Sequence, residues 1–443
     1  MEARRLRPET VALADRVCYF FHMKFKLIYP KWEKLQRQTT FHLPPHGPVV
    51  FAATLPEGVE IDFIDENLER IDFNEPADLI GISMMLTSQM KRGWEIADEY
   101  RKRGIPVICG GIGTMLHANE TAHHTDALFL GEAEGRMKQV FDDFQNNRPR
   151  KIYDYQTDSP PIAAVGTARR DILKRELYNF KGVQMVDLFH ASRGCRFNCY
   201  PCCVGFLGGK EFRPRPMEKV VEELATIENN RLFIVDNSLA QDKSWEMELF
   251  REMIPLKKKW CCHPIEDDDE VLDLAAQAGA WYVYQAVFDT SDFIRNRIKR
   301  YHDFGIGVAG AILLGMDHHT EDYIRRLIDF LLEIDLDLAE FTILTPFPHT
   351  RAFEDLQREG RIFSYDWNDY TCDKVVFQPK LMSPERLQEL HNEAWEGFYR
   401  DKSQSFRMFE LFKRVVVKEM ADGSFRRWRP AADRKFGPGI KPE

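Results

Sequence analysis

Three cysteines stand close together in one short segment of the chain, with the spacing C-x3-C-x2-C: Cys195, Cys199 and Cys202. Thiolates at this spacing can hold three corners of a cubic iron–sulfur cluster, a group that usually takes four cysteine ligands. A loop that supplies only three leaves one iron open. Because an open iron can bind a substrate, the segment predicts a cluster that does chemistry as well as passing electrons.

Two other interpretations of these thiols are less favoured. A structural zinc site usually takes two C-x2-C pairs, and the only other close thiols are Cys203 beside the loop and the pair Cys261-Cys262. A disulfide framework fits poorly, because nine cysteines in 443 residues are few and three packed so closely would pair badly. The iron–sulfur interpretation therefore stands first.

Composition limits the class of protein. The chain has 443 residues, enough for two or three domains, and its 44% hydrophobic content supports sizeable cores. The net charge of −9 argues against a nucleic-acid partner. The first residues are charged, and no apolar run approaches the roughly 20 residues of a membrane span. Free thiols without a secretion signal predict a protein of the reducing cytoplasm.

Residues 1–145 have the pattern of an open, doubly wound α/β domain. Short apolar runs predict strands at 25–29, 59–65, 79–83, 106–109 and 127–130, with a helix at 88–102 among them. Such sheets bind ligands beyond the carboxyl ends of their strands. The residues at those ends are Ser83, Thr87, Gly110, Gly111, Gly131 and Glu132.

The middle of the chain predicts a second α/β unit. Residues 146–183 contain Asn-Arg-Pro and Ser-Pro-Pro turns and are interpreted as a linker. From 184 to 345, six strand candidates alternate with helices and fit a partial (β/α)6 barrel: 184–192, 231–236, 259–263, 281–287, 306–314 and 337–344. The three cysteines directly follow the first of these strands, at the end where such barrels carry their active sites.

Residues 346–443 predict a small, mostly helical C-terminal domain that caps the barrel and helps to define the substrate. Helix candidates lie at 351–359 and 384–400. The basic stretch 426–430 near the end of the chain is interpreted as a solvated terminus, and a docking segment for an acidic partner is the alternative.

The cysteine loop with the preceding Arg193-Gly194 resembles the cluster loop of radical S-adenosylmethionine (SAM) enzymes, in which the open iron chelates the amino and carboxylate groups of SAM. Further likeness lies in the strand ends of the first domain and in motifs beyond the loop: 43–47, 65–67, 81–83, 109–113, 131–135, 235–237 and 344–350. The resemblance covers residues from about 25 to 400. It is most like the cobalamin-dependent radical SAM C-methyltransferases, which implies a flavodoxin-like cobalamin domain before the barrel.

The resemblance implies a cobalamin site along the strand ends of the first domain. Its expected residues are Ser83, Met84, Met85, Thr87, Gly110, Gly111, Gly131 and Glu132. The sequence lacks D-x-H-x-x-G, so the resemblance implies that no histidine binds the lower face of the cofactor. Residues 84–87 would approach that face, and ordinary packing at a strand end is the alternative.

The resemblance also implies SAM contacts at four positions: Tyr200, Asp236, Asn237 and Gly310. The chain departs from the family pattern near these positions: Asp236-Asn237-Ser238 stands where relatives tend to have Asp-Asp-Asn, and the stretch between Trp281 and Gly305 is short. Pro201 stands where relatives usually carry an aromatic residue before the third cysteine, and His349 replaces a glycine in the Thr-Pro-x-Pro-Gly-Thr pattern. Three further residues are candidates for a catalytic role near the substrate, with core packing as the alternative: Cys262, His263 and Tyr282.

The reaction that the resemblance implies begins when the reduced cluster passes an electron into SAM and a 5′-deoxyadenosyl radical forms. The radical takes a hydrogen atom from an unactivated carbon, and the substrate radical takes a methyl group from methylcobalamin. A low-potential donor such as ferredoxin or flavodoxin would supply electrons, and the substrate would be a peptide, a protein or a small molecule. Oxidation, cyclisation or rearrangement without methyl transfer remains the alternative, followed by a non-catalytic cluster or cobalamin-binding protein.

Overall fold

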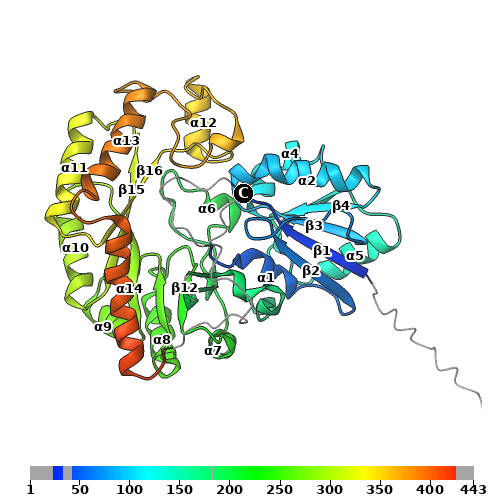
Figure 1. Cartoon of the computed structure of the whole chain (residues 1–443), viewed down its shortest axis with the longest axis horizontal. Coiled ribbons are helices and arrows are strands. Elements are labelled where there is room, and N and C mark those ends of the chain that lie inside the picture. The colour runs from blue at the N-terminus through cyan, green and yellow to red at the C-terminus, as the bar shows by residue number, and fades with distance from the viewer. Residues whose placement is uncertain (1–22, 33–41, 181–182, 185, 426–443) are drawn as a thin grey trace, which may run out of the picture.

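The structure of the protein is a computed structural model that describes residues 23–32, 42–180, 183–184 and 186–425. Two parallel sheets, each of six strands and each flanked by helices, stand next to one another (Figure 1). The first sheet belongs to the N-terminal domain and the second forms the barrel. The basic stretch 426–430 lies outside the described residues.

The N-terminal sheet has the strand order β2-β1-β3-β4-β5-β6, with every neighbouring pair parallel. Its strands are β1 (Met23–Tyr29), β2 (Val59–Asp65), β3 (Leu79–Ser83), β4 (Val107–Gly110), β5 (Ala127–Gly131) and β6 (Ile152–Tyr155). The strand β6 lies in the segment predicted as a linker. It pairs with β5 over four residues, and Tyr153 is buried in the domain core, so the sheet continues past residue 145.

Helices cover both faces of this sheet, as the doubly wound pattern predicts. They are α1 (His46–Ala52), α2 (Met90–Lys102), α3 (Ile112–Leu116), α4 (Ala118–Thr121) and α5 (Met137–Gln145). On one face, α1 and α5 pack with Phe25 and Phe129 in an aromatic core. On the other face, α2 places Ile96 and Tyr100 against a separate core. The N-terminal unit is therefore an α/β domain with two hydrophobic layers.

The barrel sheet has the order β16-β15-β14-β13-β12-β9 and is parallel throughout. Its strands are β9 (Asp187–Phe189), β12 (Arg231–Ile234), β13 (Lys259–Cys262), β14 (Ala280–Ala286), β15 (Gly307–Leu314) and β16 (Leu338–Ile343). Its outer face packs against α7 (Met217–Thr226), α8 (Lys243–Met253), α9 (Asp269–Gln277), α10 (Asp292–Asp303) and α11 (Glu321–Glu333). This agrees with the six strand–helix units that the sequence predicts.

Two short antiparallel pairs of strands lie before and after the first barrel strand. The hairpin β7 (Asn179–Phe180) and β8 (Val183–Gln184) precedes β9. After β9, the chain turns into β10 (Ser192–Arg193), which pairs antiparallel with β11 (Arg213–Pro214) instead of extending the barrel strand. The first barrel strand is therefore shorter than predicted, because its last residues close a hairpin around the cysteine loop. The short helix α6 (Val204–Leu207) lies inside that loop.

Three helices follow the barrel: α12 (Arg351–Arg358), α13 (Pro384–Phe398) and α14 (Gln404–Ala421). The helix α14 was not predicted from the sequence. This helix places Leu411 and Val415 against the inner face of the barrel sheet. A Cβ atom added at Gly307 would lie 2.5 Å from a methyl group of Leu411, so the strand and the helix are in close contact. The helix α14 therefore closes the end of the barrel at which the strands begin.

A buried ion pair fastens α14 to the barrel. Glu419 accepts from Nε and Nη2 of Arg231 at 2.9 and 2.5 Å, and both side chains are almost fully buried. Beside it, Lys259 Nζ and Asp422 Oδ2 form a second pair at 2.9 Å that is partly exposed. In the described part of the chain, no helix is long and apolar enough to cross a membrane.

The carboxylic acid of Glu246 gives the fold a predicted pH dependence. Its side chain is buried in α8, and burial raises its pKa from 4.5 to about 8, although a hydrogen bond from the backbone N–H of Glu266 lowers it. The folded protein then holds a proton that the unfolded chain releases, so the free energy of unfolding falls as pH rises from about 4.5 to about 8. Glu246→Gln is expected to raise the thermal unfolding midpoint above that of wild type at alkaline pH and to change it little near pH 4.5. Equal pH dependence in both proteins would contradict this assignment.

Candidate functional site

The cysteine loop leaves the barrel through a tight turn at Gly194. This residue has a φ of 75°, and a Cβ atom there would lie 2.0 Å from the carbonyl oxygen of Glu211. Only glycine suits this conformation at such a close approach. The next residue, Cys195, donates its backbone N–H to the carbonyl of Gly209 at 3.2 Å. The hairpin and this bond tie the two ends of the loop together.

Residues after β12 hold the same loop from the side. Gln241 accepts from the backbone N–H of Arg196 at 2.9 Å and donates to the carbonyls of Ser238 and Gly194 at 2.9 and 3.4 Å. Asn237 donates to the carbonyl of Gly194 at 3.3 Å. Sequence reasoning missed Gln241, because its only signal is its place four residues beyond Asn237.

The three predicted cluster cysteines lie on this one loop as free thiols. Cys195 is buried, whereas Cys199 and Cys202 are exposed. The backbone N–H of Cys202 donates to the carbonyl of Cys199 at 3.0 Å, and the N–H of Val204 points at Cys202 Sγ at 3.5 Å. Burial, and then the neighbouring Cys199 and Cys202, raise the pKa of the Cys195 thiol, which shows that the three lie near one another.

No three His, Cys, Asp or Glu side chains in the described ranges are close enough to share a single metal ion. A cubic cluster makes a different demand, because each cysteine binds a different iron. One buried and two exposed thiols on a tied loop, with a backbone N–H aimed at one sulfur, meet that demand. The residues present therefore fit an iron–sulfur cluster.

Asp236 is a structural anchor for the loop. Its buried carboxylate accepts from the backbone N–H of Ala191 at 2.8 Å and from the hydroxyl of Ser192. Burial raises its pKa to about 6, although these hydrogen bonds lower it. Its oxygens thus hold β10 at the end of β12, and both Asp236 and its neighbour Asn237, the two predicted SAM contacts, line the cavity described next.

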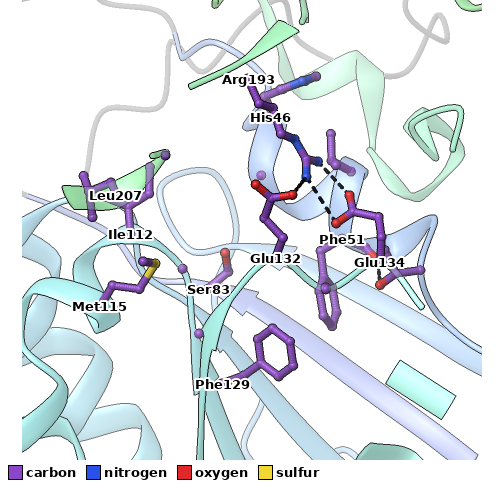
Figure 2. A pocket seen from close by; sticks show the side chains of 18 of the residues that line it. His46, Phe51, Ser83, Ile112, Met115, Phe129, Glu132, Glu134, Arg193 and Leu207 are labelled. Carbon is purple, nitrogen blue, oxygen red and sulfur yellow. Dashed lines mark hydrogen bonds and ion pairs between the residues drawn. The ribbon is translucent and has the colours of Figure 1, made fainter. Parts of the chain in front are cut away.

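A cavity of about 420 Å³ lies between the two domains (Figure 2). One wall is the strand-end edge of the N-terminal sheet, and the opposite wall comes from the ends of β9 and β12 and from α6. Predicted cobalamin residues that line it are Ser83, Gly110, Gly111, Gly131 and Glu132. Ile112, Met115 and Leu207 form an apolar group at one side of it (Figure 2).

Three predicted cobalamin residues do not line this cavity. Met84 is fully buried in the core beneath α2, where its sulfur fills the space beside Gly93. Thr87 is buried and its hydroxyl lies 3.2 Å from Nε2 of His117. Met85 is 45% exposed and turns away from the core. The residues of α3 that line the cavity beside the end of β3 are Ile112 and Met115.

The apolar part of the cavity runs as a slot into the core of the N-terminal domain. Its lining includes Phe25, Phe51, Phe129 and Phe141, which are core residues between the sheet and the helices α1 and α5. Phe51 and Phe129 are seen on this side in Figure 2. A ligand with a flat apolar portion would complete this core.

Charged residues join the domains at the cavity wall. Arg193 of the barrel donates to Glu132 at 2.8 Å and to Glu134 at 2.7 Å (Figure 2). Arg213 also pairs with Glu132. Although burial raises the pKa of Glu134, Arg193 holds it below its usual value. Glu132, which was expected to border cobalamin, therefore also binds the barrel to the N-terminal domain.

Two histidines from different domains form a second bridge that sequence reasoning missed. His46 Nε2 and His190 Nδ1 are 2.7 Å apart, and both residues line the cavity. Burial lowers both pKa values, that of His46 to about 3, so both rings are neutral. His46 Nδ1 and His190 Nε2 are buried without a hydrogen-bond partner among the described residues. The two residues are 144 positions apart in the chain, so no local sequence pattern indicates that they pair.

The predicted SAM residue Gly310 and the three candidate catalytic residues do not all lie on the same face of the barrel sheet. Cys262 belongs to the core under the helices, and a Cβ atom at Gly310 would point to Leu336 in that same layer. Tyr282 faces the barrel lumen, where its hydroxyl lies 3.4 Å from that of Tyr284. His263 packs against Tyr284 with ring centroids 6.0 Å apart, and burial lowers its pKa.

The predicted SAM residue Tyr200 lines a second cavity of about 310 Å³. This cavity lies where the cysteine loop meets the ends of β15 and β16 and the helix α12. Its polar wall includes Asp317 and Arg361, which pair at 2.8 Å, together with the exposed Arg351. The two cavities therefore flank the cysteine loop.

This fold defines a class of protein. A doubly wound domain whose glycine-edged strand ends face a three-cysteine loop on a partial barrel is the arrangement of cobalamin-dependent radical SAM enzymes, and the resemblance indicated by the sequence is confirmed. No model of a protein family matches the chain. Curated relatives and solved structures do match it over most of its length.

The chain is 26% identical over 367 residues to bacteriochlorophyllide d C-8(2)-methyltransferase of Chlorobaculum tepidum, covering 76% of this chain and 81% of that protein. An anaerobic magnesium-protoporphyrin IX monomethyl ester cyclase of Rubrivivax gelatinosus is 21% identical, covering 86% and 78%. Relatives thus include both methyltransferases and cyclases.

Two solved structures share the fold. The radical SAM methyltransferase TsrM of Kitasatospora setae, with cobalamin and a [4Fe-4S] cluster bound, is 16% identical with a TM-score of 0.61, covering 94% of this chain and 93% of that one. The cobalamin-dependent SAM radical enzyme OxsB, with aqua-cobalamin and SAM bound, is 12% identical with a TM-score of 0.64, covering 90% and 72%. The fold of this chain is therefore shared with one protein that holds cobalamin and a [4Fe-4S] cluster and with another that holds aqua-cobalamin and SAM.

Proposed function

We propose that the protein is a cobalamin-dependent radical SAM methyltransferase that methylates an unactivated sp3 carbon of a peptide, a protein or a small molecule. One observation carries the proposal: a single cavity joins the glycine-edged strand ends of the first domain to the base of the cysteine loop. Two cofactors that must meet one substrate need such a shared space. A low-potential donor such as ferredoxin or flavodoxin would supply the electrons.

The cavity suits cobalamin in its shape and its chemistry. The apolar slot would accept the flat base at the end of the cofactor's tail, and Gly110, Gly111 and Gly131 line the strand edge that would face the ring. The unpartnered nitrogens of His46 and His190 can accept from or donate to amide side chains of that ring. Ile112 and Met115 would offer an apolar surface rather than a ligand to cobalt.

When bound, the cluster with SAM supplies a 5′-deoxyadenosyl radical and cobalamin supplies a methyl group; the protein positions them. Cys195, Cys199 and Cys202 would hold three irons. Asp236 and Gln241 fix the loop that carries these thiols, and Arg193 with Glu132 fixes the first domain against it.

Cyclisation or oxidation without methyl transfer is the second candidate. The observation that favours it is the similarity to a cyclase over most of the chain. Both candidates use the same cofactors and the same cavity. Formation of S-adenosylhomocysteine distinguishes them, because only methyl transfer consumes a second SAM as a methyl donor.

Gly110→Leu tests the cobalamin site. A Cβ atom at this position would meet no atom closer than 3.5 Å, so the backbone tolerates a side chain, but a leucine would fill space at the cavity wall. We expect the affinity for cobalamin to fall at least about tenfold, since one overpacked contact costs about 1–3 kcal/mol. Titration of the full-length protein with hydroxocobalamin, followed by visible absorption after removal of free cofactor, measures this.

Gly166→Leu is the matched control, because Gly166 is exposed and lies outside the cavity. The control should bind cobalamin as wild type does. Both variants should keep the wild-type unfolding midpoint within a few degrees. If Gly110→Leu folds normally and binds cobalamin as tightly as Gly166→Leu, the cofactor does not occupy this cavity.

A further inference from the structure

The barrel lumen contains a carboxylate that no described residue neutralises. The face of β16 that carries Leu338 points into the lumen, where Leu338 packs in one cluster with Leu411 of α14. Strand alternation places Glu340 on this same face, opposite to Ala339 and Phe341, which pack against the outer helices. The side chain of Glu340 is exposed to the lumen. No hydrogen bond or ion pair to it exists among the residues that the structure describes.

Open space lies beside this carboxylate. In the sheet register, Glu340 stands next to Ala311 of β15, which stands next to Ala286 of β14. Both alanines are exposed although they lie on inner strands of the sheet. Their methyl groups leave the middle of the barrel wall uncovered, so a ligand group can reach Glu340 from the open end of the lumen.

Aromatic rings surround the space on the other strands. Tyr284 stacks on Phe233 with centroids 5.5 Å apart and lies 6.0 Å from His263. Burial, and then the nearby charge of Glu340, raise the pKa of Tyr284, which places its hydroxyl close to the carboxylate. Leu411 of α14 packs at the far end, and we call the part of the lumen bounded by these rings, the two alanines and Leu411 the chamber.

The cations that face the same lumen are already paired. Arg231 and Lys259 lie at the closed end of the barrel, where Glu419 and Asp422 neutralise them. His263 is neutral, because burial lowers its pKa and its Nδ1 lies 2.7 Å from the carbonyl of Asp236. Burial raises the pKa of Glu340, and a bound cation would stabilise its charged form because no described residue pairs with it.

We propose that this chamber binds a cationic nitrogen of the substrate, an ammonium or guanidinium group, with Glu340 as its counter-ion and Tyr284 and Phe233 against its flank. Charge-assisted hydrogen bonds and aromatic faces are the features that recognise such a group. The inference rests on the proposed function, because it assumes that the substrate of the methyl transfer enters the barrel through its mouth. It restricts the substrate to amines, such as a free amino compound or a basic side chain of a peptide.

Probe binding to the full-length protein as purified tests the inference without any enzymatic turnover. Benzylammonium and its neutral analogue benzyl alcohol are titrated separately by ligand-observed NMR. Wild type should prefer benzylammonium at least about tenfold, the effect of one hydrogen bond to a charged group. Glu340→Gln, which keeps the size of the side chain, should reduce this preference to about twofold or less.

Two further variants secure the interpretation. Glu396→Gln changes an exposed glutamate of α13 and should keep the wild-type preference. Ala311→Leu fills the space beside Glu340 without removing its charge, and it should weaken binding of both probes. If Glu340→Gln fails to fold, the loss of binding in Ala311→Leu still tests the location.

Equal affinity of wild type for the two probes would overturn the inference, and so would a preference that survives in Glu340→Gln. The competing source of positive charge is SAM itself. If Glu340→Gln weakens SAM binding by the factor that it weakens benzylammonium binding, the carboxylate serves SAM and the inference fails. Because these measurements need no cluster or cobalamin, their failure is distinct from a failure of the proposed methyl transfer.

Discussion

Alanine at Cys195, Cys199 and Cys202 together is expected to abolish formation of 5′-deoxyadenosine from SAM. The loop is the one place in the described chain where three thiols share a tied turn, so its loss leaves a cluster without ligands. We expect the variant, after anaerobic reconstitution with iron and sulfide, to lack bound iron and the visible absorption of a cluster. Single variants should show the same loss, because each would leave only two ligands.

Cys203→Ala is the matched control. Cys203 adjoins the loop, but it lies outside the C-x3-C-x2-C spacing and is the residue before α6. The control should keep both the cluster and 5′-deoxyadenosine formation. A triple variant that retains cluster absorption would refute the assignment of the loop. If Cys203→Ala loses the cluster, Cys203 is itself a ligand and the assignment of the three cysteines is wrong.

Glu419→Ala is expected to lower the free energy of unfolding by about 3–5 kcal/mol. Removal of the glutamate takes away the buried carboxylate that neutralises the guanidinium of Arg231, which is the costly way to break a buried ion pair. Denaturant unfolding of the full-length protein, followed by circular dichroism, measures the change. Because α14 closes the barrel, its release should also expose Trp281, which packs against Phe412 of that helix.

Two comparisons separate this effect from ordinary loss of a contact. Asp422→Ala removes the partly exposed neighbouring pair and should cost about 1 kcal/mol or less. The double variant Arg231→Met with Glu419→Leu replaces the pair by apolar side chains and should recover most of the stability. If Glu419→Ala costs no more than Asp422→Ala, the ion pair does not fasten the helix.

The parts of the site that the sequence predicts are those that adjoin one another along the chain. The cysteine loop is one continuous segment, and the glycines at 110–111 and 131 follow apolar strands whose ends must meet at one sheet edge. Local pattern is enough for both. The alternation of strands and helices likewise indicates the two sheets, although β6 lies where a linker was expected.

What the sequence does not reveal depends on contacts between distant segments. His46 and His190 meet only because the first domain docks on the barrel, and neither has a motif around it. The helix α14 shows its role only when its apolar side meets the start of the barrel strands. The turn after β3 buries Met84 and brings Ile112 to the cavity, and strand patterns alone cannot predict the direction of such a turn.

The most direct test of the central claim is product analysis on the full-length protein reconstituted anaerobically with iron, sulfide and cobalamin, then given SAM and a low-potential reductant. The account predicts 5′-deoxyadenosine and S-adenosylhomocysteine together, with the first lost in the triple cysteine variant and the second reduced in Gly110→Leu. With an amine substrate, the two should form in equal amounts and the substrate should gain one methylene in mass. Production of 5′-deoxyadenosine without S-adenosylhomocysteine would contradict methyl transfer, and absence of both would contradict the enzyme assignment itself.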